Sequence, residues 1–215
     1  MQTVSLENSV AMIPDGASLM IGGFMAVGTP ERVVDEIVRQ NKRDLTIIAN
    51  DTATPDKGIG KLVAAKLLRK AIVSHIGLNA ETQRQMMAGE LEVQLVPQGT
   101  LIEQIRAGGF GLGGILTATG VGTPVQDGKQ IIKVAGKTFL VEAALRADFA
   151  LVHAFVADYL GNLGYGGHSG SPHLTRSSLT RNPAPRARPR SRTPHPGLKR
   201  LAQFRGGWRD HPRSR

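Results

Sequence analysis

The sequence predicts an α/β protein with an open, mostly parallel sheet flanked by helices and a small β-hairpin insertion. Short apolar runs alternate with amphipathic helical patterns from residue 4 to about residue 163, which is typical of βαβ units. Most of these runs are continuously apolar, as in strands that are buried on both faces. Ala135-Gly136-Lys137 separates two further apolar runs and predicts the turn of the hairpin.

Each element follows from its local pattern. Residues 30–41, for example, place Val33, Val34, Ile37 and Val38 on one helical face. Besides a helix that includes Glu7, the expected helices are residues 30–41, 59–68, 80–87 and 99–107. The expected strands are residues 19–24, 45–49, 71–76, 91–96 and 149–157, with hairpin strands at 130–134 and 138–141.

Composition limits the class of protein. The chain has no cysteine, which excludes a disulfide framework or a thiolate metal site and fits a reducing compartment. We find no secretory pattern in residues 1–7. The longest apolar stretch, residues 17–28, is broken by glycines and falls short of the roughly 20 residues of a membrane helix. We therefore expect a cytoplasmic protein with no membrane partner.

The net charge of +10 belongs to one end of the chain, and this distribution argues against nucleic acid as a partner. Residues 1–163 hold 15 basic and 16 acidic side chains, whereas residues 164–215 hold 12 basic side chains against Asp210. Residues 182–192 have no apolar periodicity and bury too little surface to fold. We therefore expect a domain at residues 1–165 and a basic, Pro/Arg-rich, largely disordered or irregular tail at residues 166–215. An arm for nucleic acid or an acidic partner, a linker, and translation in a shifted reading frame remain open as explanations of this tail.

A glycine-rich loop between a strand and a helix is the strongest functional signal. Three apolar residues lead into Gly22-Gly23, Gly28 follows, and Thr29-Pro30 is expected to cap and open a helix. Glycines let backbone approach a ligand, and a helix start attracts phosphate or carboxylate. An ordinary βα turn is the alternative interpretation. The adjacent glycines do not match the dinucleotide fingerprint, and no GxxxxGK[ST] loop is present, which disfavours NAD and ATP.

Residues 15–30 match the pattern Asp-Gly-x-x-(apolar)3-Gly-Gly-Phe-x-x-x-Gly-x-Pro at every position. In this the chain resembles the α subunit of family I (3-oxoacid) coenzyme A transferases, close to the acetate/acetoacetate type. The resemblance covers about residues 3–165 and implies a CoA-transferase/isomerase-like fold. Further matching segments are Val96-Pro97-Gln98-Gly99-Thr100-Leu101, Arg106-Ala107-Gly108-Gly109, Thr119-Gly120-Val121-Gly122-Thr123, Leu145-Arg146-Ala147-Asp148 and Gly161-Asn162-Leu163.

The resemblance implies a heteromeric enzyme that moves coenzyme A between short-chain acids. A glutamate carboxylate forms an acyl anhydride and then an enzyme–CoA thioester, which divides one acyl transfer into easier steps. The resemblance assigns that glutamate to a β subunit, within Ser-Glu-Asn-Gly. Leu6-Glu7-Asn8-Ser9 lacks the glycine and lies in an expected helix, so we treat the similarity as accidental. Coenzyme A is then the substrate, with no permanently bound cofactor, and the β subunit is the partner.

The same resemblance implies the site residues. Gln98 would support a developing oxyanion with its amide N–H, although it could also be a turn residue that caps the next helix. Asn50 and Asp51 lie at a strand end where open α/β sheets bind ligands. Asp51 departs from the Asn-Asn often found in the family, so both roles stay open. The residues expected to line the coenzyme A site are Gly22, Gly23, Phe24, Met25, Ala26, Val27 and Gly28.

Other titratable side chains favour structural roles. We expect His75 to be structural and His153 to be a core histidine with satisfied hydrogen bonds, and we expect Glu103 to lie on a solvated or salt-bridged face. Met86-Met87 is expected in the core. The tail histidines have no ligand-like spacing, and no metal site is predicted; they are His168, His173, His195 and His211.

The resemblance ends soon after Gly164, where the family continues with Ala-Arg-Asn-Phe-Asn and about fifty further residues. The tail replaces nearly that length, which favours a shifted reading frame. We expect this loss to leave an exposed apolar edge, reduced stability and impaired β-subunit assembly.

Two competing functions remain: a basic-tailed nucleic-acid or acidic-partner binding protein, and a sugar-phosphate isomerase. The first requires salt-sensitive binding by the tail, and the second requires a general base near the glycine loop.

Overall fold

The computed structural model describes residues 3–158 and 160–165 and the backbone of residues 199–204. Its helices are α1 (Leu6–Ala11), α2 (Glu31–Arg39), α3 (Gly60–Ala64), α4 (Ala80–Met87), α5 (Gln98–Phe110) and the 3-10 turn η1 (Pro124–Gln126). Its strands are β1 (Ser18–Ile21), β2 (Leu45–Asp51), β3 (Leu68–His75), β4 (Glu92–Leu95), β5 (Gly114–Thr117), β6 (Ile131–Val134), β7 (Lys137–Ala143), β8 (Phe149–Ala154), β9 (Val156–Ala157), β10 (Leu163–Gly164) and β11 (Lys199–Phe204).

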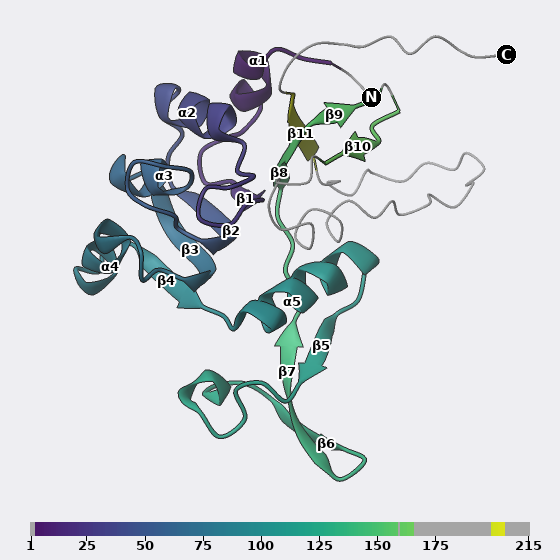
Figure 1. The fold of residues 1–215 in the computed structure, drawn as a ribbon. Coiled ribbons are helices and arrows are strands. Elements are labelled where there is room, and N and C mark those ends of the chain that lie inside the picture. Colours follow the sequence, from purple (N-terminus) through teal and green to yellow (C-terminus); the bar gives the residue numbers. More distant parts are fainter. Residues whose placement is uncertain (1–2, 159, 166–198, 205–215) are drawn as a thin grey trace, which may run out of the picture.

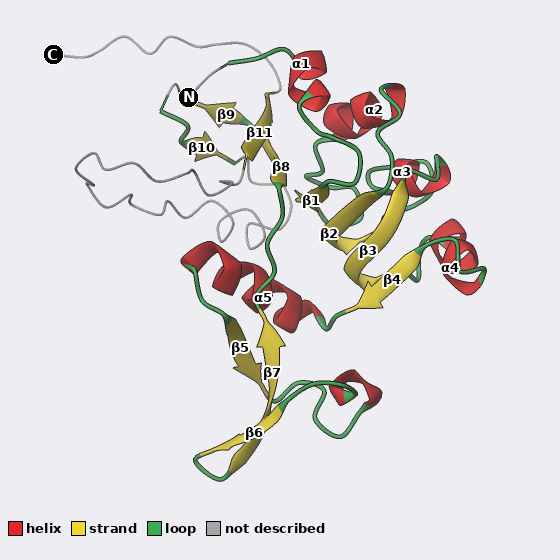
Figure 2. Ribbon diagram, turned by 180° about the vertical axis from the view of Figure 1, so that it is seen from behind, coloured by secondary structure: helices red, strands yellow, loops and turns green. Residues whose placement is uncertain are grey.

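A parallel sheet forms the centre of the molecule, as predicted. Its order is β11-β8-β1-β2-β3-β4, and every neighbouring pair runs parallel. The helices α1 to α4 lie along one side, while α5 lies on the other (Figure 1, Figure 2). The architecture is therefore an open α/β sheet with helices on both faces.

The two faces of the sheet build two separate cores. Along β2, Ile47 and Ala49 join the core that contains Val33 of α2 and Leu62 of α3. Ile48, between them, joins the smaller core under α5. Successive side chains of a strand point to opposite faces, so one apolar run supplies both layers. This explains why the central strands are continuously apolar.

The expected hairpin belongs to a larger insertion. β6 and β7 pair antiparallel around Ala135 and Gly136, whose φ angles of +49° and +77° fit the two-residue turn preferred in hairpins. β5 pairs with the other edge of β7, giving a three-stranded antiparallel sheet in the order β5-β7-β6. This sheet projects from the body beyond α5 (Figure 1).

Several element boundaries were wrong. The helix expected at 59–68 ends at Ala64, because the chain turns at Lys66 with a φ of +54° and Leu68 already begins β3. The strand expected at 19–24 ends at Ile21, before the glycines. The strand expected at 149–157 is divided into β8 and β9. Met86 and Met87 were also misplaced, since they lie on the outer face of α4 with exposed fractions of 36% and 77%.

The predicted tail, residues 166–215, falls mostly outside the described residues. Within it, β11 pairs in parallel with β8 from Phe149 to Ala154 and so covers the edge that was expected to be open. Exposed apolar side chains follow β8 instead, at Phe155, Val156 and Leu160. No helix in the described part of the chain is long and apolar enough to cross a membrane.

Candidate functional site

The carboxyl ends of three neighbouring strands bring most of the expected site residues together. The glycine loop follows β1, Asn50 and Asp51 end β2, and Ser74 lies near the end of β3. Gln98 opens α5 and reaches the same edge from the opposite face of the sheet. Open α/β sheets bind ligands at this edge.

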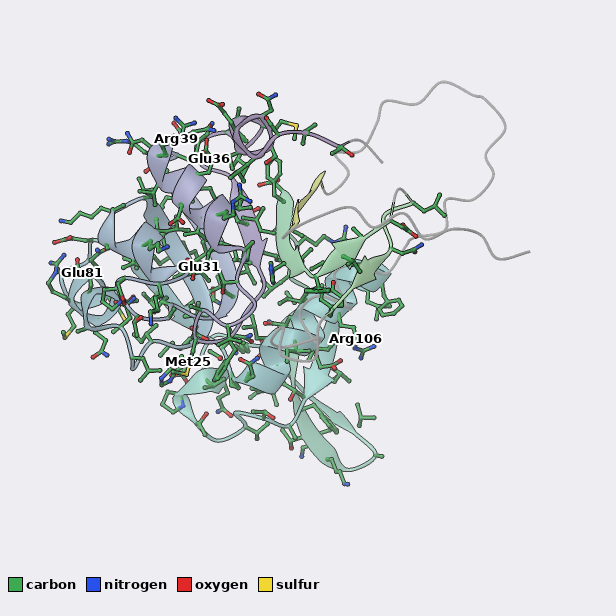
Figure 3. All side chains as sticks on the ribbon, turned by 45° about the horizontal axis from the view of Figure 1, so that its top comes forward. Met25, Glu31, Glu36, Arg39, Glu81 and Arg106 are labelled. Carbon is green, nitrogen blue, oxygen red and sulfur yellow. The ribbon has the colours of Figure 1, made fainter. Side chains whose placement is uncertain are left out.

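The glycine loop is a tight two-residue turn with an exposed apolar tip. Phe24 and Val27 exchange backbone hydrogen bonds of 3.0 and 2.9 Å. Between them, Met25 and Ala26 have φ angles of +48° and +68°, which residues other than glycine rarely adopt. Phe24, Met25 and Val27 are 53%, 45% and 55% exposed. The turn thus presents apolar side chains to solvent, and Met25 is labelled on it in Figure 3.

Gly23 is required by the packing of the loop itself. Its φ is +120°, and a β-carbon there would lie 2.1 Å from Oγ1 of Thr29. Thr29 is consequently buried beneath the turn rather than capping α2, so the predicted N-cap was wrong. Pro30 takes the N-cap position, outside the first helical turn, and no side chain caps the helix.

The start of α2 already has a negative charge beside it. Glu31, in its first turn, accepts a hydrogen bond of 2.8 Å from the N–H of Gly58 and pairs with Lys61 at 2.8 Å. A carboxylate in this place complements the positive end of the helix dipole. The N–H groups of Phe24, Val27 and Thr29 also bond within the loop. The chain's own groups therefore take up much of the predicted anion-binding capacity.

Gln98 is held by a directed chain of hydrogen bonds. The carbonyl oxygen of Gly23 can only accept, so it faces Nδ2 of Asn50 at 2.6 Å. Oδ1 of Asn50 then accepts from Nε2 of Gln98, and Oε1 of Gln98 faces the hydroxyl of Ser74. That hydroxyl also lies 2.7 Å from the carbonyl oxygen of Asn50. The amide of Gln98 thus has one orientation.

Asn50 and Ser74 complete this chain, although sequence reasoning left the role of Asn50 open and did not single out Ser74. Asn50 is only 2% exposed, whereas Gln98 is exposed to solvent. The position of Asn50 at a strand end was its only sequence signal. Ser74 had none, because a serine before a strand end is common.

Asp51 binds two loops through its two carboxylate oxygens. Oδ2 accepts from the N–H of Met25 at 3.0 Å, and Oδ1 accepts from the N–H of Ala53 at 2.7 Å. The residue is 4% exposed, so its carboxylate is covered by the loops that it binds.

The remaining candidates lie outside this arrangement or at its rim. His75 is exposed at the end of β3 with its ring against Gly77, and Glu7 lies on α1, paired with Arg39. Glu103 pairs with Arg106 on the exposed side of α5, as predicted. His153 departs from the expected satisfied core histidine, since its buried Nδ1 has no hydrogen-bond partner in the described structure. Among the residues that the structure describes, no group of three or more His, Cys, Asp or Glu side chains could hold a metal ion.

Asp148, from another matching segment, ties the sheet together. Its Oδ2 accepts from the N–H and the hydroxyl of Ser18 at 2.9 and 2.7 Å, across 130 residues of sequence. These hydrogen bonds lower the pKa of the Asp148 carboxyl. The segment therefore fixes β8 beside β1 and has no contact with the glycine loop among the bonds described.

A parallel sheet with a glycine turn and an oriented amide at the carboxyl ends of its strands defines an open α/β protein with a candidate site at the edge where such sheets bind ligands. The Coenzyme A transferase family model matches residues 3–172. The chain belongs to the coenzyme A transferase family, and as such it is a transferase that uses coenzyme A as substrate and carrier. This membership favours the predicted transferase function over the nucleic-acid alternative.

Named relatives agree with this family. The chain is 56% identical over 162 residues to the acetate CoA-transferase subunit alpha of Escherichia coli, covering 75% of this chain and 74% of the relative. It is 47% identical over 179 residues to the acetoacetyl-CoA:acetate/butyrate CoA transferase alpha subunit of Clostridium acetobutylicum, covering 82% of each.

Solved structures share the fold. A variant of the decarboxylase AibA/AibB superposes with a TM-score of 0.68 at 31% identity, over 81% of this chain and 70% of that one. Glutaconate coenzyme A-transferase from Acidaminococcus fermentans gives a TM-score of 0.67 at 21% identity, over 77% of this chain and 60% of that one. The second similarity concerns the fold alone.

Proposed function

We propose that this chain is the α subunit of a heteromeric enzyme that moves coenzyme A between a short-chain acyl-CoA and a short-chain acid or 3-oxoacid, of the acetyl-CoA/acetoacetate type. The α-subunit names of the relatives support a β-subunit partner. Acetate and acetoacetyl-CoA in those names support the substrate class. We include a cytoplasmic location in this proposal.

The observation that carries the proposal is the orientation of the Gln98 amide, which Asn50 and Ser74 fix. Nε2 of Gln98 has two hydrogens, of which Asn50 accepts one, so the other is available to a thioester or anhydride oxygen. Such a donor stabilises negative charge that develops on an acyl oxygen. Asp51 accepts two backbone N–H groups and is buried, so it is poorly suited to attack an acyl-CoA. This supports a nucleophilic glutamate on the partner.

In the proposed division of work, this chain binds the carrier and orients the acyl oxygen. The exposed side chains of Phe24, Met25 and Val27, on the turn between Gly22, Gly23 and Gly28, supply an apolar surface for the pantetheine arm. The partner's carboxylate attacks the thioester carbon, and the thiolate of coenzyme A leaves. The thiolate then attacks the glutamyl carbonyl of the anhydride, which gives the glutamyl thioester and releases the first acid. The second acid reverses these steps, so bonds and charge balance.

The test is a coenzyme A exchange assay on the full chain with and without the β subunit from its own genome. We expect transfer from acetoacetyl-CoA to acetate only when both chains are present, with ping-pong kinetics. Mass spectrometry of the products distinguishes thioester exchange from loss of carbon dioxide. Turnover by this chain alone would place the nucleophile in it and overturn the proposal, as would decarboxylation without exchange.

A further inference from the structure

We infer that Asp51 is a positioning residue that holds the coenzyme A loop in its binding conformation by pinning two strained turns with one carboxylate. The inference rests on the proposed function of the glycine loop. It assigns to Asp51 a role that acts through this loop and not on the reacting atoms. The observations that carry it are the two hydrogen bonds of Asp51, the backbone angles of the residues that it holds, and the packing beneath them.

Both hydrogen bonds end on residues next to or within strained backbone. Met25 has a φ of +48° and is followed by Ala26 at +68°, while Ala53 has a φ of +51°. A residue other than glycine in this region costs about 1 kcal/mol and persists only when its surroundings determine it. Since Asp51 accepts the N–H groups of both Met25 and Ala53, one side chain determines both turns.

The two turns also contact each other through a third element. A β-carbon on Gly58 would lie 3.1 Å from that of Ala26 and 3.5 Å from that of Ala53, so Gly58 fits closely between them. Glu31 holds Gly58 by accepting its N–H at 2.8 Å. The glycine loop therefore rests on the segment from Ala53 to Gly58, and carboxylates fasten both parts. Glu31, like Met25, is labelled in Figure 3.

In this chain the two hydrogen bonds favour a carboxylate over an amide at position 51. Each of its two oxygens accepts from a different N–H, and an asparagine would offer only one oxygen. The amide nitrogen of the asparagine would then face an N–H donor at this buried position, leaving one loop without its partner. The aspartate at this place thus has a physical reason.

Asp148 provides a matched comparison within the chain. It also accepts a backbone N–H, from Ser18, but both of its donors converge on the single oxygen Oδ2. An asparagine at position 148 can therefore keep both bonds, whereas an asparagine at position 51 cannot. The pair Asp51→Asn and Asp148→Asn separates the loss of a charge from the loss of the second acceptor.

The experiment measures hydrogen–deuterium exchange of the full chain and the kinetics of the complex with the β subunit. In Asp51→Asn we expect amides of residues 22–28 and 52–58 to exchange at least about tenfold faster, with the central strands unchanged. We expect the KM for acyl-CoA to rise about tenfold, because binding must now order the loop, while kcat at saturation stays within about twofold. Asp148→Asn should change neither quantity, and Asp148→Ala should lower the Tm without raising that KM.

The two proposals fail in different ways. If the wild-type complex does not transfer coenzyme A, the proposed function fails. The hydrogen–deuterium exchange measurement still tests whether Asp51 holds the two loops. Unchanged exchange of residues 22–28 in Asp51→Asn would overturn the inference. So would faster exchange spread over the whole sheet, or a fall in kcat with an unchanged KM for acyl-CoA, since these are the signatures of general destabilisation.

Discussion

The amide nitrogen of Gln98 donates to the amide oxygen of Asn50, which ties the first residue of α5 to the end of β2. Asn50 is itself fixed by the carbonyl oxygen of Gly23 at 2.6 Å. The loop, the sheet edge and the helix start therefore share one chain of hydrogen bonds, and each member has a single allowed orientation. A substitution at one end of this series of hydrogen bonds should therefore alter the position of the groups at the other end.

Gln98→Ala should reduce kcat while leaving acyl-CoA binding largely intact. The variant removes an N–H donor that the proposed mechanism directs at the acyl oxygen, and loss of one such donor typically costs about 10²–10³-fold in kcat. Steady-state kinetics of the complex measure this effect. Gln94→Ala is the control, since Gln94 is exposed on β4 and takes no part in the hydrogen bonds that hold Gln98. A kcat equal to that of the wild type would exclude the proposed role of Gln98.

Val27→Asp should weaken acyl-CoA binding without unfolding the protein. Val27 is 55% exposed and takes part in the turn through its backbone, so its side chain can change while the turn remains. The new carboxylate removes apolar contact and repels the phosphates of coenzyme A. We expect the Kd for coenzyme A to rise about tenfold, with stability within about 0.5 kcal/mol of the wild type.

Calorimetry of the complex with coenzyme A checks the effect of Val27→Asp. Val4→Asp is the matched control, because Val4 is 41% exposed and precedes α1. Equal affinities in the two variants would mean that the turn does not contact coenzyme A. Gly23 is unsuited to this purpose, since any side chain there collides with Thr29 and disrupts the loop whether or not a ligand binds.

The fold was predictable where local signals agree. The helix at residues 80–87 has the predicted bounds because Asn79 caps it by accepting from the N–H of Thr82, and Gly89 follows with a φ of +69°. The helix at 59–68 failed because Leu67 and Leu68 continue its apolar pattern. Only the left-handed conformation of Lys66 redirects them into β3, and a lysine gives no signal for it.

The site was predictable as a set of positions and not as a set of contacts. Its place after buried parallel strands follows from the sheet, so the glycine loop, Asn50 and Asp51 could be expected at one edge. The bond between Gln98 and Asn50 spans 48 residues and depends on where α5 crosses the sheet, which periodicity does not determine. Thr29 failed as a cap for a similar reason, because packing against Gly23 outweighs its local preference.

Lys129→Met should destabilise the antiparallel insertion. Glu142 on β7 is 4% exposed and pairs with Lys129 at 2.6 Å, while Nε2 of Gln104 on α5 lies 3.2 Å away. Removing the lysine leaves a buried carboxylate with one neutral donor, which we expect to cost about 3 kcal/mol. Urea unfolding measures the loss. The double variant Lys129→Met/Glu142→Leu should recover most of it, and a double variant no more stable than the single one would contradict this account.

Acid should weaken the join between β1 and β8 through Asp148. Its hydrogen bonds from Ser18 lower the pKa of this carboxyl in the folded state relative to the value of about 3.9 in an unfolded chain. The stabilisation is therefore complete above pH of about 4 and is lost as the pH falls through the lower, folded pKa. Asp148→Asn keeps the shape but has no charge to lose, so its deficit in unfolding free energy relative to the wild type should shrink between about pH 5 and pH 2. Urea unfolding across that range measures the deficit, and a deficit that stays constant or grows on acidification would show that Asp148 does not contribute through its charge.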